Sequence, residues 1–305
     1  MSVTKELMEN RLRVRKSALN LVDGKLFYKE KPFTGVAFDE QDHFIVAAIN
    51  VEQGVVTGEY HNGYFDIPKD ALLMTEYNPI IDSEWSDYNY LPQLKHDGKY
   101  VNGVMYDFED GFCTKETLLV NGWEEIELSW HRNGAFNIYL NWKEQHVGGG
   151  FVFDDTGRLT RFTVGKGENL KLDVDFSGEN SIEKLGLNQD FFSTTNDFTD
   201  NLPFQFITKI SDLLEYRSGE EIWFSEDGIN PELFERLFSS GFFAETKEMH
   251  FFNTAISPDE LEKIALIPNL QKIKIHDYHG NLGSAMEELK RRRPEVKVEY
   301  EFELK

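Results

Sequence analysis

The sequence predicts an α+β protein made of two repeat bodies: an N-terminal antiparallel β-meander of about 23-residue hairpin repeats and a C-terminal short solenoid of strands and helices. Three observations lead to this fold class. The 305 residues are about twice the usual length of one domain. Alternating apolar and polar residues recur with turn dipeptides in the first half, and short strands alternate with capped helices in the second. We therefore expect domains over 1–180 and 205–305, joined by a linker over 181–204.

The first half of the chain contains five similar units that each combine an alternating strand with a turn. Their starts are 23, 45, 24 and 23 residues apart, at Gly35, Gly58, Gly103, Glu127 and Gly150. Dipeptides that supply the positive φ of tight hairpin turns follow four of these starts, at Asn62-Gly63, Asp110-Gly111, Asn133-Gly134 and Thr156-Gly157. The longest step holds two units, and the degenerate sequence over 82–91 predicts a loop or insertion there.

One segment of this half resembles a known family. Asp23 to Phe38 reads DGKLFYKEKPFTGVAF and is followed by recurring Gly-x-x-Phe/Tyr-Asp units, which is similar to MORN-repeat-variant proteins. Many members of that family are described as antitoxin-like or immunity-like bacterial proteins. The resemblance covers about residues 21–165 and implies a β-repeat fold without catalytic residues.

The second half alternates strands with helices every 23 to 27 residues. Short strands are expected at Ile222–Phe224, Met249–Phe251, Ile273–Ile275 and Val296–Val298. Helices are expected between them over 230–241, 257–268 and 284–294. Proline at the first helical position of the first two helices, capping boxes at Ser257 and Ser284, and glycine or proline at the ends support these limits. Strand plus helix at this spacing resembles a leucine-rich repeat, whose parallel strands line one face.

Alternation along these strands sends neighbouring side chains to a core face and an outer face. The middle positions are expected to form a row on the outer face, namely Trp223, His250, Lys274 and Lys297. We expect six residues of this face to bind a protein partner, because aromatic side chains dominate interface energetics. They are Trp223, Ser225, His250, Phe252, Lys274 and His276. In the alternative interpretation, Trp223 and Phe252 are covered by the preceding segment or by the β half.

No residue pattern indicates a catalytic centre, a metal site or a cofactor. The run from Asp173 to Gly178 begins like a calcium loop, but Lys184 stands where such a loop needs glutamate. His250 and His276 are expected to lie diagonally on neighbouring strands, with no Glu-x-x-His or cysteine partner for a metal. Cys113 has no histidine placed to activate it. We therefore expect neither catalysis nor a bound metal.

The charge of the chain is strongly negative and unevenly distributed. Acidic residues number 54 against 32 basic ones, which gives a net charge of −22. Residues 32–210 hold 30 acidic and 12 basic side chains, and so carry −18 of that charge. Such a field repels nucleic acid and anionic lipid and attracts a cationic partner.

Cysteine content and hydropathy favour the cytoplasm. Cys113 is the one cysteine, so the chain cannot form an internal disulfide. Neither a signal peptide nor an apolar run of membrane-spanning length occurs. We expect a cytoplasmic protein that binds neither a membrane nor nucleic acid.

Together these features predict a non-enzymatic protein-binding module. With the MORN-variant resemblance, they predict a bacterial immunity or antitoxin protein that neutralises a basic protein toxin by direct binding. Two alternatives stay open. A structural or scaffolding repeat protein would have constitutive partners or would associate with itself. A hydrolase would need one pocket to hold two or more of Asp154, Asp173, Asp175 and His146.

Overall fold

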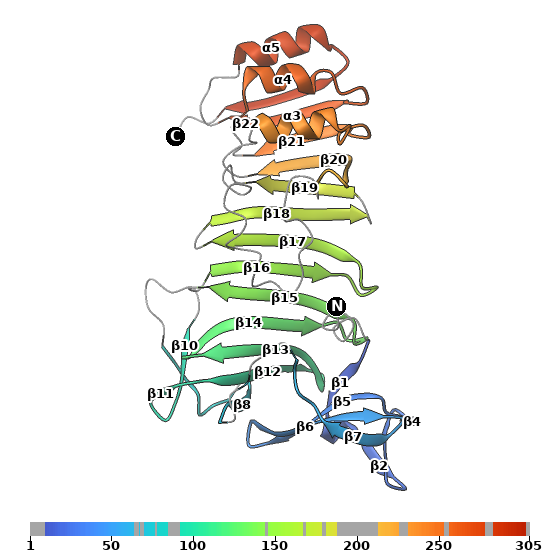
Figure 1. Ribbon diagram of the computed structural model, residues 1–305, viewed down its shortest axis with the longest axis vertical. Helices are drawn as coiled ribbons and strands as arrows, with labels where there is room; N and C mark the ends of the chain where they lie inside the picture. The colour runs from blue at the N-terminus through green and yellow to red at the C-terminus, as the bar shows by residue number, and fades with distance from the viewer. Residues whose placement is uncertain are drawn as a thin grey trace. The chain divides into compact units, whose positions relative to one another are not determined.

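Figure 1 shows a computed structural model of the chain, which describes residues 10–63, 67, 70–76, 78–84, 92–143, 146–166, 169–178, 181–187, 213–225, 231–252, 256–277 and 283–302. The chain divides into two compact units. Unit 1 comprises Met1–Val147 and Val152–Arg158, and unit 2 comprises Gly148–Phe151 and Leu159–Lys305. None of the helices in the described residues is both long and apolar enough to cross a membrane.

The elements as far as β15 are β1 (Leu12–Arg15), η1 (Lys16–Ala18), β2 (Asn20–Val22), β3 (Lys25–Tyr28), β4 (Lys31–Pro32), β5 (Gly35–Gln41), β6 (Phe44–Glu52), β7 (Val55–Glu59), β8 (Leu72–Thr75), β9 (Asp82–Glu84), β10 (Gln93–His96), β11 (Lys99–Tyr100), β12 (Gly103–Glu109), β13 (Phe112–Val120), β14 (Trp123–Trp130) and β15 (Phe136–Lys143). After these come β16 (His146–Phe153), β17 (Leu159–Lys166), β18 (Asn169–Gly178), β19 (Ser181–Leu187), β20 (Arg217–Ser225), α3 (Pro231–Ser239), β21 (Glu248–Phe252), α4 (Pro258–Ile264), β22 (Lys272–Asp277), α5 (Gly283–Arg292) and β23 (Lys297–Phe302).

The predicted α+β fold class, a β-meander followed by a separate strand-helix solenoid, is wrong. The described residues are mainly β, with 57% in strands and 12% in helices, and 17 strands form one mixed sheet. The predicted solenoid is not separate from the preceding strands because β19 pairs with β20. Strand β19 opens the predicted linker of 181–204, yet it pairs in parallel with β20, with Leu185 opposite Phe224. Backbone groups that a linker would leave to water are therefore used to continue a sheet.

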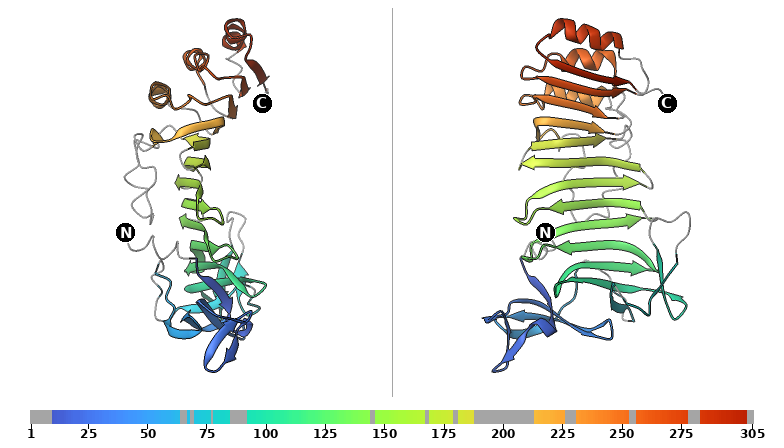
Figure 2. Two further views of the ribbon diagram at one scale, coloured as in Figure 1. Left: turned by 90° about the vertical axis from the view of Figure 1, so that its right-hand side faces the viewer. Right: turned by 180° about the vertical axis from the view of Figure 1, so that it is seen from behind.

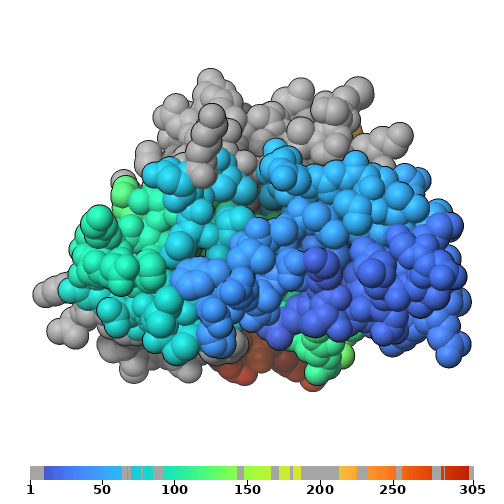
Figure 3. Space-filling model, turned by 90° about the horizontal axis from the view of Figure 1, so that it is seen from below, coloured from blue at the N-terminus to red at the C-terminus, as the bar shows by residue number. Residues whose placement is uncertain are grey.

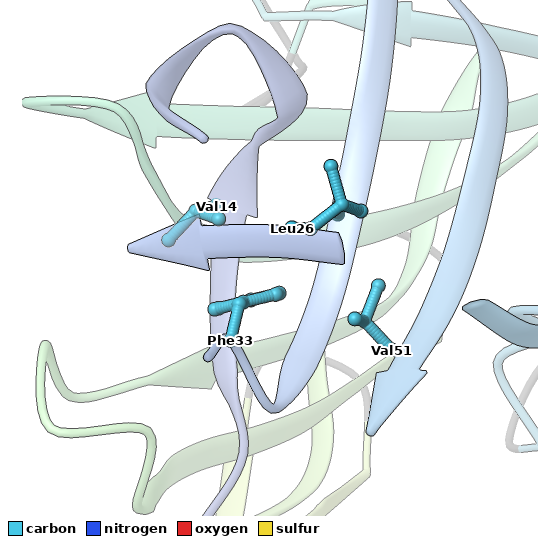
Figure 4. Close-up of a cluster of buried hydrophobic side chains, with 5 residues drawn as sticks. Val14, Leu26, Phe33 and Val51 are labelled. Carbon is cyan, nitrogen blue, oxygen red and sulfur yellow. The ribbon is translucent and has the colours of Figure 1, made fainter. Parts of the chain in front are cut away.

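Unit 1 contains a small three-stranded sheet of β2, β3 and β4 that is attached to the turn between β6 and β7 by a ring of backbone hydrogen bonds. Leu26 N–H donates to the carbonyl of Gly54 (2.8 Å), Gly54 N–H to that of Phe33 (2.7 Å), and Phe33 N–H to that of Leu26 (2.9 Å). Apolar side chains from β1 and β6, Val14 and Val51, pack against Leu26 and Phe33 in the core that Figure 4 shows.

The same arrangement occurs a second time in unit 1, around the three-stranded sheet of β9, β10 and β11. Leu94 N–H donates to the carbonyl of Gly122 (2.9 Å), Gly122 N–H to that of Val101 (2.7 Å), and Val101 N–H to that of Leu94 (3.0 Å). Val101 packs with Met105 and Leu119 in a second core. The space-filling view in Figure 3 shows the two copies side by side, the first in blue and the second in cyan to green.

Hairpins follow the second copy. Strands β12 to β15 pair antiparallel, each with the next. The turn between β12 and β13 holds Asp110 and Gly111 at positive φ (50° and 84°), as a two-residue hairpin loop needs. The dipeptide Asn62-Gly63 has another role. Asn62 is buried, and its Nδ2 donates to Glu116 Oε2 (2.5 Å) on β13.

Unit 2 begins with antiparallel strands and continues with parallel ones. Strands β17, β18 and β19 pair antiparallel, whereas β20, β21, β22 and β23 pair in parallel in chain order. Helices α3, α4 and α5 connect the parallel strands and lie on one of their faces (Figure 2). The predicted capping box of α4 is confirmed, because Ser257 Oγ accepts from Glu260 N–H (3.2 Å) and Glu260 Oε2 accepts from Ser257 N–H (2.6 Å).

Candidate functional site

The four parallel strands of unit 2 have a buried face and an outer face. The buried face carries large apolar side chains, which are Ile222, Phe224, Met249, Phe251, Ile273 and Ile275. The alternate residues form what we call the outer face, which consists of Glu221, Trp223, Glu248, His250, Lys272, Lys274, His276, Lys297, Glu299 and Glu301. The helices pack against the buried face, because this contact removes the apolar side chains of both the helices and the strands from water.

Strand register decides which outer residues are neighbours. Trp223 lies opposite His250, and His250 lies opposite Lys274. The fourth member of this row is Glu299, whereas the sequence analysis expected Lys297, which lies opposite Lys272. The error arose because the strand-start pattern was extended to β23 by spacing alone. The register of β23 is set instead by Val298 pairing with Ile273.

Trp223 and His250 form a stacked pair across β20 and β21. Their ring centroids are 4.2 Å apart and the ring planes differ by 12°. Trp223 Nε1 donates to Glu221 Oε1 (2.8 Å), which holds the indole over the imidazole. As a result, Trp223 is 39% exposed, but His250 beneath it is only 5% exposed although it belongs to the outer face.

Ionic contacts surround this pair. His250 Nε2 lies 3.2 Å from Glu221 Oε1 and 3.5 Å from Glu248 Oε2. Lys272 Nζ lies 3.2 Å from Glu248 Oε2, and this contact raises the pKa of Lys272 above its ordinary value. Further along, Glu301 contacts Lys274 (3.7 Å) and His276 Nδ1 (3.0 Å). The outer face therefore has an aromatic pair on β20 and β21, with residues of both charges around it and on β22 and β23.

The structure brings together four of the six predicted binding residues. Trp223, His250, Lys274 and His276 all lie on the outer face, and the histidines are diagonal as expected, since His276 lies opposite Phe252. The backbones of Ser225 and Phe252 belong to β20 and β21, but their side chains lie outside the described residues. Whether any of the six contacts a partner stays a prediction.

The carboxylates of the outer face were not predicted from the sequence. Glu221 and Glu248 stand two residues before Trp223 and His250, and they lie opposite each other in the parallel pair. Extending the period-2 alternation by one further position on each strand would have found them. Glu299 and Glu301 were missed for the same reason.

The acidic residues of the hydrolase alternative have other contacts. Asp173 is buried, and its carboxylate receives Arg161 Nε and Nη2 (2.9 Å each) and Lys184 Nζ (2.8 Å). Asp154 accepts hydrogen bonds from Thr156 and Arg158 in its own turn, and these bonds lower the pKa of its carboxyl. The side chain of His146 lies outside the described residues.

Cys113 and the cleft between α4 and α5 are poor candidates for a functional site. Burial raises the pKa of the Cys113 thiol well above its ordinary value, which disfavours the reactive thiolate. The cleft has a volume of about 200 Å³, and Leu261, Leu289 and Arg292 are among its lining residues. Pockets for small-molecule ligands usually measure about 300 to 1,000 Å³, so this cleft is small for a substrate.

Comparison with known proteins gives no family. No protein-family model matches the chain, and no curated protein matches it. Solved structures with some similarity include the Glycosylation Associate Protein (Gap123) complex from Streptococcus agalactiae, with a TM-score of 0.30, 10% identity, and coverage of 73% of this chain and 40% of that chain. Accessory secretory protein 1,2 and 3 in Streptococcus pneumoniae gives a TM-score of 0.27, 10% identity, and coverage of 79% and 45%.

A GtfA/B complex gives a TM-score of 0.23, 7% identity, and coverage of 72% of this chain and 42% of that chain. In all three cases this chain spans less than half the length of the chain that it matches. Similarity at these TM-scores assigns neither a fold family nor an activity.

Proposed function

We propose that this chain is a non-enzymatic protein-binding module that holds its partner on the outer face of β20–β23. The observation that carries this proposal is the exposed ring of Trp223 on β20, stacked on His250 of β21. Tryptophan is enriched among the residues that dominate binding energy. Because the stack and the Glu221 hydrogen bond already orient this ring, little side-chain entropy is lost when a partner covers it.

The charged residues of the outer face also suit a surface that binds a protein. Interfaces usually combine an aromatic or apolar centre with a polar rim that keeps contact with water. Here the ion pair Glu248–Lys272 joins β21 to β22, and the ion pair Glu301–Lys274 joins β23 to β22, on the same face as Trp223. Such pairs fix the orientation of a partner and penalise partners with mismatched charge.

The finer part of the proposal concerns the partner, which we take to be a basic protein toxin that this chain neutralises as a bacterial immunity or antitoxin protein. The resemblance of residues 21–165 to MORN-repeat variants supports that class. The net charge of −22 supports a cationic partner, because a negative field speeds its association. The outer face carries four carboxylates and three lysines, so this field comes mainly from the rest of the chain.

A binding measurement with matched variants tests the contact surface. Capture from the source cell with mass spectrometry identifies the partner, and surface plasmon resonance then measures its affinity. Trp223→Ala should weaken binding about thirtyfold, which corresponds to roughly 2 kcal/mol. Tyr100→Ala is the control, because it removes an aromatic ring of similar exposure (45% against 39%) from unit 1 and should not alter the affinity. A folded Trp223→Ala variant with parental affinity would place the contact elsewhere.

Salt dependence tests the charge of the partner. The association rate constant should fall as ionic strength rises to the physiological value, where the Debye length is about 8 Å. A rate constant that does not respond to salt would rule out a partner steered by charge. If the captured partner is a second copy of the chain or a constitutive structural component, the scaffolding alternative is correct instead.

A further inference from the structure

Three potential metal ligands meet on the outer face of β20 and β21. One ligand atom each from Glu221, Glu248 and His250 lies within 4.8 Å of the other two. Glu221 and Glu248 are register partners on the neighbouring strands, and His250 stands two residues after Glu248. Because residues two apart on a strand share a face, the sheet itself holds all three side chains on one side.

The burial of His250 is a second observation that points to a ligand. Its side chain is 7% exposed, and neither ring nitrogen makes a hydrogen bond of acceptable geometry. A buried polar atom without such a bond is costly, which makes the site suited to a ligand that would satisfy it. Nε2 is directed toward the two carboxylates, at 3.2 Å from Glu221 Oε1 and 3.5 Å from Glu248 Oε2.

These separations match those between ligands of tetrahedral zinc. Zinc binds imidazole nitrogen and carboxylate oxygen at about 2.0–2.1 Å, so two ligand atoms at a tetrahedral angle lie about 3.3 Å apart. The observed separations from Nε2 bracket that value. Both carboxylates are partly exposed, at 46% and 40%, and can rotate to complete the arrangement.

We propose that Glu221, Glu248 and His250 form a zinc-binding site. An imidazole with two carboxylates suits zinc better than calcium or magnesium, which prefer oxygen ligands alone. Three protein ligands leave one position for water. Trp223 orients the site from outside, since its indole covers the imidazole and its Nε1 donates to Glu221. Histidine spacing in the sequence predicted no metal, because the two carboxylates come from different strands and meet only through strand register.

Lys272 contacts the cluster directly and opposes a cation there. Its ammonium group lies 3.2 Å from Glu248 Oε2 and neutralises part of the charge that zinc would meet. Removing that ammonium group should therefore strengthen zinc binding. If His250 and the two glutamates only form a salt bridge with one another, replacing Lys272 should leave the zinc affinity unchanged.

The test is isothermal titration calorimetry of the metal-free chain with zinc chloride. We expect one zinc ion per chain in the parent protein. His250→Phe keeps an aromatic ring under Trp223 and should weaken binding at least about tenfold. Lys272→Met should tighten binding. Glu301→Gln is the control, because that carboxylate pairs with His276 and Lys274 on the same face but lies outside the cluster.

A double variant, Glu221→Gln with Glu248→Gln, keeps the test valid if His250→Phe does not fold, because both glutamate side chains are partly exposed. Parent protein that binds no zinc, or variants of the three ligands that bind it as tightly as the parent, would overturn the site. The site needs no protein partner, so this titration is independent of the outcome for the proposed function.

Discussion

Gly35 and Gly103 each lie with the α-carbon against the backbone of a neighbouring parallel strand. A β-carbon on Gly103 would be 1.9 Å from the carbonyl oxygen of Leu72, and one on Gly35 would be 2.2 Å from that of Leu12. Leu12 and Leu72 are the register partners of these glycines in the parallel pairs β1–β5 and β8–β12. The two glycines are therefore equivalent positions in the repeated arrangement of unit 1, and each sets how closely two strands approach.

Substitution of Gly103 by alanine should destabilise the protein. The new β-carbon would meet backbone atoms of Leu72, which cannot move aside as a flexible side chain would, so β8 and β12 must separate. Overpacking of this kind costs about 3 kcal/mol. The free energy of unfolding in urea, followed by circular dichroism, measures the loss.

Gly58→Ala is the matched control for this prediction. Gly58 also lies in a strand, β7, but a β-carbon there would have no neighbour within 4 Å. Alanine should leave the free energy of unfolding unchanged or raise it slightly, because it reduces the freedom of the unfolded chain. Equal losses for both alanine variants would show that close strand approach is not the reason for glycine at position 103.

Short-range patterns in the sequence predicted local structure better than the fold. Asp110-Gly111 forms a hairpin turn and Ser257 begins a capping box, because each depends on residues that are adjacent or three apart. Asn62-Gly63 has the same turn composition, yet the Asn62 side chain binds Glu116 on β13. The parallel pairing of β19 with β20 likewise joins segments far apart in the chain, and no local pattern encodes it.

For the candidate site, too, the sequence predicted the local features and not the contacts between strands. Alternation correctly placed Trp223 outward between buried Ile222 and Phe224. It did not predict that His250 would be buried, because that depends on the indole of Trp223 lying flat on the neighbouring strand. It also did not predict that Glu221 and Glu248 would meet, because strand register determines which residues of two strands lie opposite.

Asp173 should be important for the stability of unit 2. Its side chain is 4% exposed, and its carboxylate receives three hydrogen bonds, two from Arg161 and one from Lys184. Asp173→Asn keeps the shape but removes the negative charge, so Arg161 and Lys184 keep only the more exposed Asp175, 3.5 Å from Arg161 Nε, as a counter-ion. We expect a loss of about 2 kcal/mol in the free energy of unfolding, measured by urea denaturation.

The exposed Asp97 offers a comparison, because its side chain is 89% exposed and Asp97→Asn should have no measurable effect. A second comparison removes one of the cations. Arg161→Gln in the Asp173→Asn background should recover part of the loss, since the repulsion from Lys184 is then relieved. Additive losses from the two substitutions would contradict a coupled triad.

Glu76, in the turn after β8, should make the stability of the protein depend on pH. Burial of its carboxyl and a hydrogen bond to Asp107 raise its pKa from 4.5 to about 7, although Lys115 at 3.4 Å opposes the shift. Between these two pKa values, the folded chain holds a proton that the unfolded chain has released. The free energy of unfolding contributed by Glu76 is therefore fully present below pH 4.5 and is lost as the pH rises to about 7.

Glu76→Gln removes this titration while keeping a neutral side chain of the same shape. At about pH 8 the variant should be more stable than the parent by roughly 1 to 2 kcal/mol, a value reduced from the full shift because the carboxyl is partly exposed and pairs with Lys115. Near pH 4 the two proteins should have equal stability. Urea denaturation across this range measures the difference, with Glu59→Gln, whose side chain is 82% exposed, as the control. If the parent and Glu76→Gln differ by the same amount at every pH, Glu76 does not take up a proton in the folded protein near neutrality.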